Sequence, residues 1–204
     1  MLVISSATKT AIIALQTQQV TQFCEIEADC KQSEKMMQEI DQILTKNDIS
    51  LEDVGNFGLV IGPGSFTGLR IGAALIKGFC AGLPKKKVVL IPTLDLMAAQ
   101  VIKDYHPKSK FTCYMKAQSG LFYGATYDKT ANKIVDEHLL SAADVLKGSE
   151  RKFCLAEEGF LPYIISIQPQ TLLEVANKAE KEGNLIAAKD IVIKYIRRSA
   201  AEEN

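Results

Sequence analysis

The sequence predicts an α/β protein built on mixed sheets, and three observations lead to this prediction. Three apolar, strand-like runs separated by polar turns come first, within residues 2–27. From residue 33 onward, helical and strand-like patterns alternate. A glycine-rich turn at 62–68 joins an apolar strand directly to a helix of small residues. A meander followed by strand–helix alternation is typical of a sheet with both antiparallel and parallel strands.

The first half of the chain supplies the strand meander and three helices. Apolar runs bounded by polar turns indicate the strands, and the uninterrupted run before the glycine turn indicates a buried one. Ser33 introduces a helix whose apolar side chains recur at helical spacing, and Thr93 caps another helix. In chain order we expect strands at 2–4, 11–15 and 17–27, a helix at 33–46, a strand at 57–61, a helix at 67–83, a strand at 88–91 and a helix at 93–104.

The second half follows after Tyr105–Lys110, a polar stretch with one proline that we interpret as a domain boundary. Ser141 caps a short helix, and Gly183 is the glycine that follows the last turn of a longer one. The predicted division is a first lobe of residues 1–104 and a smaller second lobe of residues 105–204. The segment after about residue 184 is a candidate to pack back on the first lobe. Here we expect strands at 111–116, 120–128, 133–139 and 152–156, and helices at 141–147 and 170–182.

This order of strands and helices is that of the ribonuclease-H-like unit found in actin, hexokinase and the sugar kinases. A chain of 204 residues is long enough for two such lobes, each with its own core. The predicted fold class is therefore a ribonuclease-H-like, actin-like α/β fold with two lobes, mixed sheets and a shortened second lobe.

Composition and charge exclude several classes of protein. The 24 basic and 24 acidic side chains balance, so no overall positive field draws the chain to nucleic acid. The five cysteines are odd in number and form no C-x-x-C pair, which favours a reducing, cytoplasmic location. No apolar run approaches the roughly 20 residues of a membrane span, and no basic region precedes the first strand as in a signal peptide. We therefore expect no membrane partner.

The glycine-rich turn at Gly62–Gly68 allows two interpretations. Glycines permit positive φ and close backbone approach, and Ser65 or Thr67 can cap the following helix, so the turn can be purely structural. Free N–H groups at a helix start can also hold a phosphate, although a P-loop would place a lysine after its last glycine. This chain has Arg70 instead, one turn into the helix. If an anion or nucleotide binds, Ser65, Thr67 and Arg70 are the side chains expected near it.

The run GPGSFTGLRIG at 62–72 resembles the signature of the bacterial TsaB (YeaZ) family, the non-catalytic paralogues of TsaD. The resemblance implies the actin-like (ASKHA) fold. It also implies a place in tRNA threonylcarbamoyladenosine (t6A) biosynthesis, in which TsaD transfers a threonylcarbamoyl group to the adenosine beside the anticodon. Four further segments resemble parts of that family, strongly up to about Ala99 and weakly beyond: Met1–Thr8, Ile91–Asp95, Tyr114–Tyr127 and Ile193–Arg197.

Three positions depart from the family pattern. Ser5 stands where the family usually has aspartate, Gln32 where it commonly has histidine, and Lys116 opens a segment that is commonly Asp-Ala-Arg. Nucleotide-hydrolysing members of the fold use the carboxylate to hold Mg²⁺, and a neutral hydroxyl is a poor ligand beside it. The only two histidines, His106 and His138, are not at metal-ligand spacing. We therefore expect no catalytic residue and no metal site.

The helix at 67–83 is apolar nearly all round, so it must be covered nearly all round. The sheet covers one side, and the other is left for a second chain, for the opposite lobe or for the C-terminal segment. Methionines on the helix at 33–46 also suit an interface. The resemblance implies that these two helices pack against the matching pair of a TsaD-like subunit, or of a second copy in a homodimer. The residues expected at this interface are Met36, Met37, Ile40, Ile43, Leu44, Ile71, Ala74, Leu75, Gly78 and Phe79.

The predicted function is a non-catalytic scaffold or dimerisation subunit that binds and supports TsaD in t6A modification. A TsaE-like ATPase is the further partner that the resemblance implies. We expect this chain to contact tRNA only as part of the complex. No cofactor is expected, unless ATP or ADP binds at a partner interface. Two alternatives stay open. One is a divergent ASKHA-fold ATPase or kinase-like enzyme, and the other is a regulatory module that binds nucleotide in a cleft without turnover.

Overall fold

The computed structural model describes residues 1–27 and 32–194, and the chain forms two compact units within that range. The first unit comprises Met1–Ile91 and Pro169–Ile193, and the second comprises Pro92–Gln168 with Lys194. The chain therefore passes from one unit to the other more than once. The side chain of Gln32, and residues 195–197 of the closing family segment, lie outside what the structure describes.

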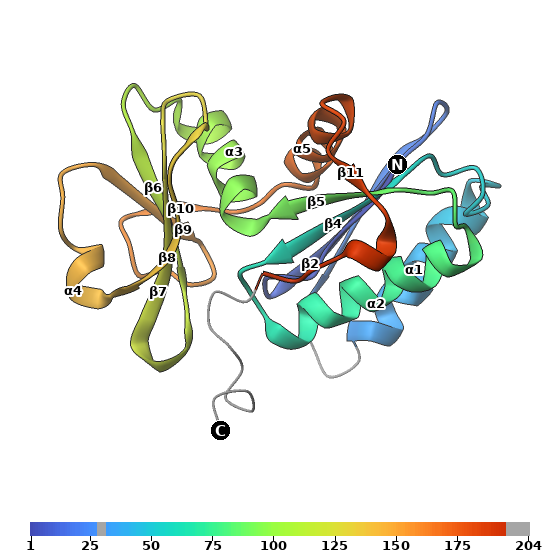
Figure 1. Cartoon of the computed structure of the whole chain (residues 1–204), viewed down its shortest axis with the longest axis horizontal. Coiled ribbons are helices and arrows are strands. Elements are labelled where there is room, and N and C mark those ends of the chain that lie inside the picture. The colour runs from blue at the N-terminus through green and yellow to red at the C-terminus, as the bar shows by residue number, and fades with distance from the viewer. Residues whose placement is uncertain (28–31, 195–204) are drawn as a thin grey trace. The chain divides into compact units, whose positions relative to one another are not determined.

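The first unit is built on a six-stranded mixed sheet with the strand order β11-β5-β4-β1-β2-β3. The strand β1 pairs antiparallel with β2 and parallel with β4, and β2 pairs antiparallel with β3. Helices α1 and α2 lie on one face of this sheet, and α5 lies on the other (Figure 1). The strands are β1 (Leu2–Ser5), β2 (Thr10–Gln16), β3 (Thr21–Glu27), β4 (Phe57–Gly62), β5 (Val88–Pro92) and β11 (Leu185–Ile186). The helices are α1 (Gln32–Lys46), α2 (Phe66–Gly82) and α5 (Pro169–Lys181), followed by the 3₁₀ turn η2 (Ala188–Asp190).

The second unit repeats the strand order of the first in a five-stranded sheet, β10-β9-β6-β7-β8. The strand β6 takes the place of β1, because it pairs antiparallel with β7 and parallel with β9. Helix α3 covers one face of the sheet, and the four-residue α4 lies on the other (Figure 1). The elements are α3 (Thr93–Tyr105), β6 (Phe111–Lys116), the 3₁₀ turn η1 (Gln118–Gly120), β7 (Leu121–Tyr127), β8 (Lys133–Ser141), α4 (Ala142–Val145), β9 (Arg151–Leu155) and β10 (Tyr163–Ile165).

The predicted fold class is confirmed, with two mixed sheets of ribonuclease-H-like strand order. The third strand begins at Thr21 rather than at Thr17, because Thr17 closes a turn instead. Its N–H donates to the carbonyl of Val20 at 2.8 Å, and its hydroxyl accepts from two backbone N–H groups. The two short strands β10 and β11 carry too few residues to show a pattern, and sequence analysis did not predict them.

The two units differ from the predicted lobes 1–104 and 105–204 in where two helices belong. Helix α3 packs on the second sheet, where Leu94, Met97 and Val101 share a core with Phe111. Helix α5 packs on the first sheet instead, although it follows the second sheet in sequence. There, Asn177 donates to the Gln16 side chain at 2.7 Å. An amphipathic helix shows which of its faces is buried but not which sheet buries it. Of the segment after residue 184, residues 185–193 lie in the first unit, where β11 pairs antiparallel with β5.

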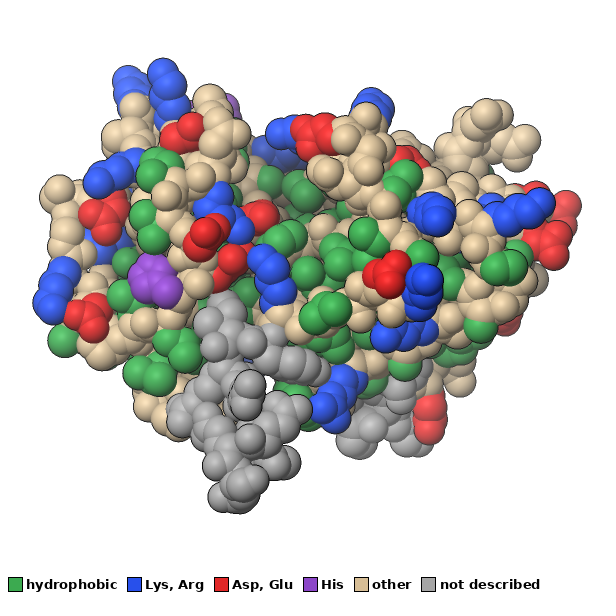
Figure 2. All heavy atoms as spheres, in the orientation of Figure 1, with side chains coloured by type: hydrophobic (Ala, Val, Ile, Leu, Met, Phe, Trp, Pro, Cys, Tyr) green, Lys and Arg blue, Asp and Glu red, His purple; other side chains and the backbone are tan. Residues whose placement is uncertain are grey.

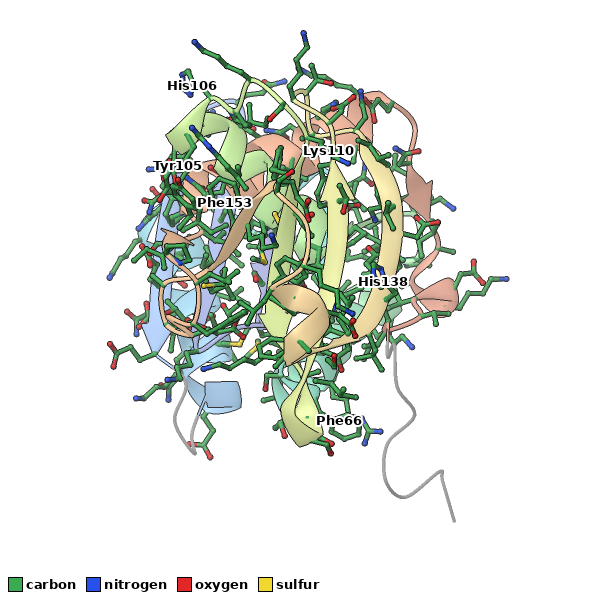
Figure 3. All side chains as sticks on the ribbon, turned by 90° about the vertical axis from the view of Figure 1, so that its left-hand side faces the viewer. Phe66, Tyr105, His106, Lys110, His138 and Phe153 are labelled. Carbon is green, nitrogen blue, oxygen red and sulfur yellow. The ribbon has the colours of Figure 1, made fainter. Side chains whose placement is uncertain are left out.

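Aromatic packing organises the core of the second unit. The ring of Tyr105, at the end of α3, meets the ring of Phe153 on β9 edge-on, with 4.9 Å between centroids (Figure 3). The Tyr127 hydroxyl donates to Asp95 in the first turn of α3 at 2.7 Å, and Lys133 pairs with the same carboxylate at 2.8 Å. Burial, together with the charge of Asp95, holds the pKa of the Tyr127 hydroxyl far above its usual range. Tyr127 is therefore a neutral donor that fixes α3 to the sheet.

Among the helices that the structure describes, none combines the length and the apolar character that crossing a membrane requires.

Candidate functional site

The glycine turn between β4 and α2 is tied to the turn between β1 and β2. The backbone N–H of Ser65 donates to the carbonyl of Ala7 at 2.7 Å. The buried hydroxyl of Ser6 donates to the carbonyl of Gly68 at 2.7 Å. Both turns lie at the same edge of the sheet, because β1 and β4 are parallel neighbours. These two hydrogen bonds set the position at which α2 begins.

The glycine turn and the β1–β2 turn lie so close together that two positions of the glycine turn have no room for a side chain. A Cβ on Gly64 would lie 2.3 Å from the carbonyl oxygen of Ala7, and one on Gly68 would lie 1.9 Å from the carbonyl oxygen of Ser6. Gly64 also has a φ of 159°, at the limit of the range that side chains rarely adopt. The packing of the chain on itself therefore explains these glycines without a ligand.

The three residues predicted near an anion lie at the exposed start of α2. Ser65 is the N-cap, and its hydroxyl accepts from the N–H of Gly68 at 3.2 Å. Thr67 is exposed. The guanidinium of Arg70 lies 3.8 Å from the centre of the Phe66 ring, a stacked arrangement of the kind that holds a cation on an aromatic face. Figure 3 labels Phe66 at this end of the helix. An anion contact at these side chains stays a prediction.

Ser5, at the position of the missing carboxylate, ends β1 and is only 1% exposed. Its hydroxyl has no hydrogen-bond partner among the described residues. A buried neutral hydroxyl offers little to a metal ion or a phosphate, which take charged or open oxygen ligands and donors. The two histidines, His106 after α3 and His138 on β8, lie far apart (Figure 3). Residues 1–27 and 32–194 hold no group of three His, Cys, Asp or Glu side chains placed to share a metal ion.

Helix α2 has one flank that the chain covers and one that it leaves open. Ala73, Ile76 and Cys80 are buried in the first core, and Ile191 from the C-terminal segment is buried in the same core. The first sheet and Ile191 of the C-terminal segment therefore cover this flank together. On the other flank, Ala74 and Gly78 are exposed and Ile71 and Leu75 are half-buried.

Half of the residues predicted at a partner interface are buried in the first core instead. On α1, Met36 is fully buried and Met37 is 44% exposed, because neighbouring positions on a helix point about 100° apart. The open surface therefore reduces to Met37, Ile71, Ala74, Leu75 and Gly78. The predicted interface residues found in the core are Met36, Ile40, Ile43, Leu44 and Phe79.

The open flank of α2 leads into a hollow of about 410 Å³ at the end of the helix. Gly78 and Gly82 line it, and the loop at Ser50–Glu52 forms its opposite wall. A Cβ on either glycine would meet nothing within 4 Å. Gly72 differs, because a Cβ there would lie 2.6 Å from the hydroxyl of Ser6. Sequence analysis singled out Gly78 but not the loop, because nothing in the pattern of 50–52 links it to α2.

The turn after β6 contains Lys116, the third position that departs from the family pattern. It is held by Glu158, which sequence analysis did not single out. Glu158 accepts the backbone N–H of Lys116 through Oε1 at 2.9 Å, and the Lys116 ammonium donates to the Glu158 carbonyl at 2.9 Å. The other carboxylate oxygen, Oε2, is buried without a partner among the described residues. Burial raises the pKa of Glu158 to about 7. Ionised Glu158 is therefore unfavourable in the folded protein.

This carboxyl gives the protein a pH-dependent stability that a Glu158→Gln variant should lack. Because the pKa in the folded state lies above the ordinary value of 4.5, ionisation above pH 7 should cost stability that is retained below pH 4.5. Partial solvent screening reduces the effect to about 1–2 kcal/mol. Urea unfolding at pH 5 and pH 8 measures it. The wild type should lose that amount relative to the variant between the two pH values, and parallel losses would contradict the assignment.

Comparisons with known proteins agree with this architecture. The sequence model of the family described as TsaD, tRNA N6-adenosine threonylcarbamoyltransferase, matches residues 4–202. A "tRNA threonylcarbamoyladenosine biosynthesis protein TsaB" of Buchnera aphidicola subsp. Baizongia pistaciae is 26% identical over 144 residues, covering 66% of this chain and 65% of that protein. The TsaB of Escherichia coli K12 is 28% identical over 102 residues, covering 50% of this chain and 43% of that protein.

The matched region thus spans just under two thirds of the Buchnera relative and less than half of the Escherichia coli one. Among solved structures, YeaZ from Pseudomonas aeruginosa superposes with a TM-score of 0.78 at 16% identity, over 95% of this chain and 98% of that one. That similarity shows the fold. The chain therefore belongs to the family that the TsaD sequence model describes, in which the relatives it resembles are the TsaB (YeaZ) proteins.

Proposed function

We propose that this chain is a non-catalytic subunit of the machinery of t6A biosynthesis, and that it binds a TsaD-like catalytic subunit through the open flank of α2. The names of the relatives support the pathway. The observation that carries the binding surface is the pair of glycines at 78 and 82, which stand on an open helix face where the chain itself has no use for them.

A glycine inside a helix costs up to about 1 kcal/mol relative to alanine. Gly68 and Gly72 offset that cost by letting α2 approach the β1–β2 turn. Gly78 and Gly82 have no such contact. Together with Ala74 they are spaced four residues apart, so they form one line of small residues along the helix. A line of this kind lets the backbone of another helix come close, and the half-buried Ile71 and Leu75 supply apolar area beside it.

The remaining partners follow from the same proposal. A homodimer through this flank would compete with the TsaD-like subunit for one surface. A TsaE-like ATPase joins the complex, and any ATP or ADP binds at the partner interface. At the position where the family usually has aspartate, the chain offers only the neutral, buried Ser5.

The test is reconstitution with the TsaD-like subunit of the same organism. The mixture should elute from gel filtration as a complex larger than either chain, and omission of this chain should reduce t6A formation on tRNA at least about tenfold. A mixture that elutes as separate chains, with unchanged t6A formation, would overturn the proposal. Magnesium-dependent ATP hydrolysis by this chain alone would instead favour the enzyme alternative.

A further inference from the structure

A second hollow lies in the first unit, between the C-terminal half of α2 and the segment that runs from β11 into η2. Its volume is about 500 Å³, within the range of small-molecule sites. Small apolar residues form its floor, among them Cys80, Pro84 and Ala188. It shares no lining residue with the hollow at Gly78, so it is a separate feature of the surface.

Three lysines line this hollow, and none of the described residues that line it is acidic. Lys86 is held in place, because its ammonium donates to the carbonyl of Glu52 at 2.8 Å and to the carbonyl of Val54. Lys77 and Lys189 are exposed, and neither forms an ion pair within the described part of the chain. Three lysines thus line one largely apolar hollow, and its described lining residues include no carboxylate.

This local charge contrasts with the chain as a whole, whose 24 basic and 24 acidic side chains balance. Figure 2 shows several Lys and Arg side chains over α2 and the chain beside it, with an acidic side chain next to them. Like charges around one hollow repel one another, and an anion bound among them removes that repulsion. The ammonium of Lys86 is held by two backbone carbonyls, so Lys86 adds a fixed positive charge to the lining of the hollow.

We propose that this hollow binds a phosphate group carried on an organic body. Lys77, Lys86 and Lys189 hold the phosphate as point charges, and the apolar floor takes the carbon part of the ligand. The inference goes beyond the proposed function, because it concerns neither the open flank of α2 nor t6A chemistry. Such a phosphate can come from a small soluble compound or from an RNA strand, and the two sources are separated by the test below.

The test measures binding to the full chain by isothermal titration calorimetry, with pyrophosphate as the small probe and a single-stranded RNA 12-mer as the polymer probe. The variant Lys77→Ala/Lys189→Ala removes two charges from the hollow. The matched control Lys85→Ala/Lys87→Ala removes two charges from the neighbouring exposed loop, outside the lining residues. Thermal unfolding of all three proteins checks that each is folded.

Binding of either probe should be at least about tenfold weaker in the hollow variant and less than about twofold weaker in the control. Saturable binding of pyrophosphate assigns a small phosphorylated ligand. Saturable binding of RNA alone assigns a strand phosphate, and the dependence of affinity on salt should then weaken with each lysine removed. Equal loss in both variants would overturn the proposal, because the charge would then act without the hollow. Absence of saturable binding by both probes would also overturn it.

Discussion

Replacing Gly68 by alanine should strongly destabilise the first unit. The new Cβ would lie 1.9 Å from the carbonyl oxygen of Ser6, a distance at which no side chain can be accommodated. The new Cβ is fixed to the backbone of α2, and the carbonyl oxygen is part of the backbone of the β1–β2 turn. The clash can therefore be relieved only if α2 moves away from that turn. Moving the helix breaks the hydrogen bonds from Ser6 to Gly68 and from Ser65 to Ala7.

The expected loss exceeds about 4 kcal/mol, which falls among the rare large effects of single substitutions and is a large share of the roughly 5–15 kcal/mol that stabilises a typical domain. Circular dichroism at 25 °C and urea unfolding measure it. Gly78→Ala is the matched control, since it makes the same change in the same helix where a Cβ meets nothing within 4 Å. That variant should gain about 0.5–1 kcal/mol from helix propensity. A Gly68→Ala protein as stable as the wild type would show that the two turns do not touch as described.

The glycine turn shows how far the sequence alone could go. Glycines, a capping serine and the small residues behind them predicted a turn that opens a tightly packed helix, and the N-cap at Ser65 is confirmed. The partner of the turn could not be predicted, because Ser6 and Ala7 lie about 60 residues earlier and carry no signal of their own. The contact arises from the parallel pairing of β1 with β4, which is a property of the sheet.

The helix faces show a different limit. Periodicity correctly predicted that Met36 and Ile40 share an apolar face, yet it could not tell whether the chain or a partner buries that face. Both kinds of burial select the same residue types. Only the fold separates the buried Met36 from the exposed Met37, and the required Gly72 from the unexplained Gly78.

The two hollows could not be found from sequence at all. Lys77 and Lys189 are more than a hundred positions apart, and they line one hollow because the C-terminal segment returns to the first sheet through β11. Glu158 likewise accepts a hydrogen bond from the backbone N–H of Lys116 because β6 and β9 are parallel neighbours in the second sheet. Long-range strand pairing therefore creates the features that no local pattern predicts.

Replacing Gly78 by leucine should abolish binding of the TsaD-like subunit while the chain stays folded. The leucine side chain projects from an exposed position into open space, so the free protein loses nothing and gains helix propensity. In the complex, the same side chain would stand between two helices that must approach along the line of Ala74, Gly78 and Gly82. Overpacking at the centre of such a contact costs about 3 kcal/mol, so the affinity should fall at least about 100-fold.

Surface plasmon resonance with the immobilised TsaD-like subunit measures this loss, and thermal unfolding confirms that the variant is folded. Ala143→Leu is the matched control, because it places the same bulk on an exposed helix position of the second unit. It should bind like the wild type. Gly78→Ala should fall between the two, since a methyl group fills less of the approach than an isobutyl group does. A Gly78→Leu protein that binds at full affinity would move the interface away from the open flank of α2. The glycines at 78 and 82 would then be without a physical cause, because the chain's own packing requires neither of them.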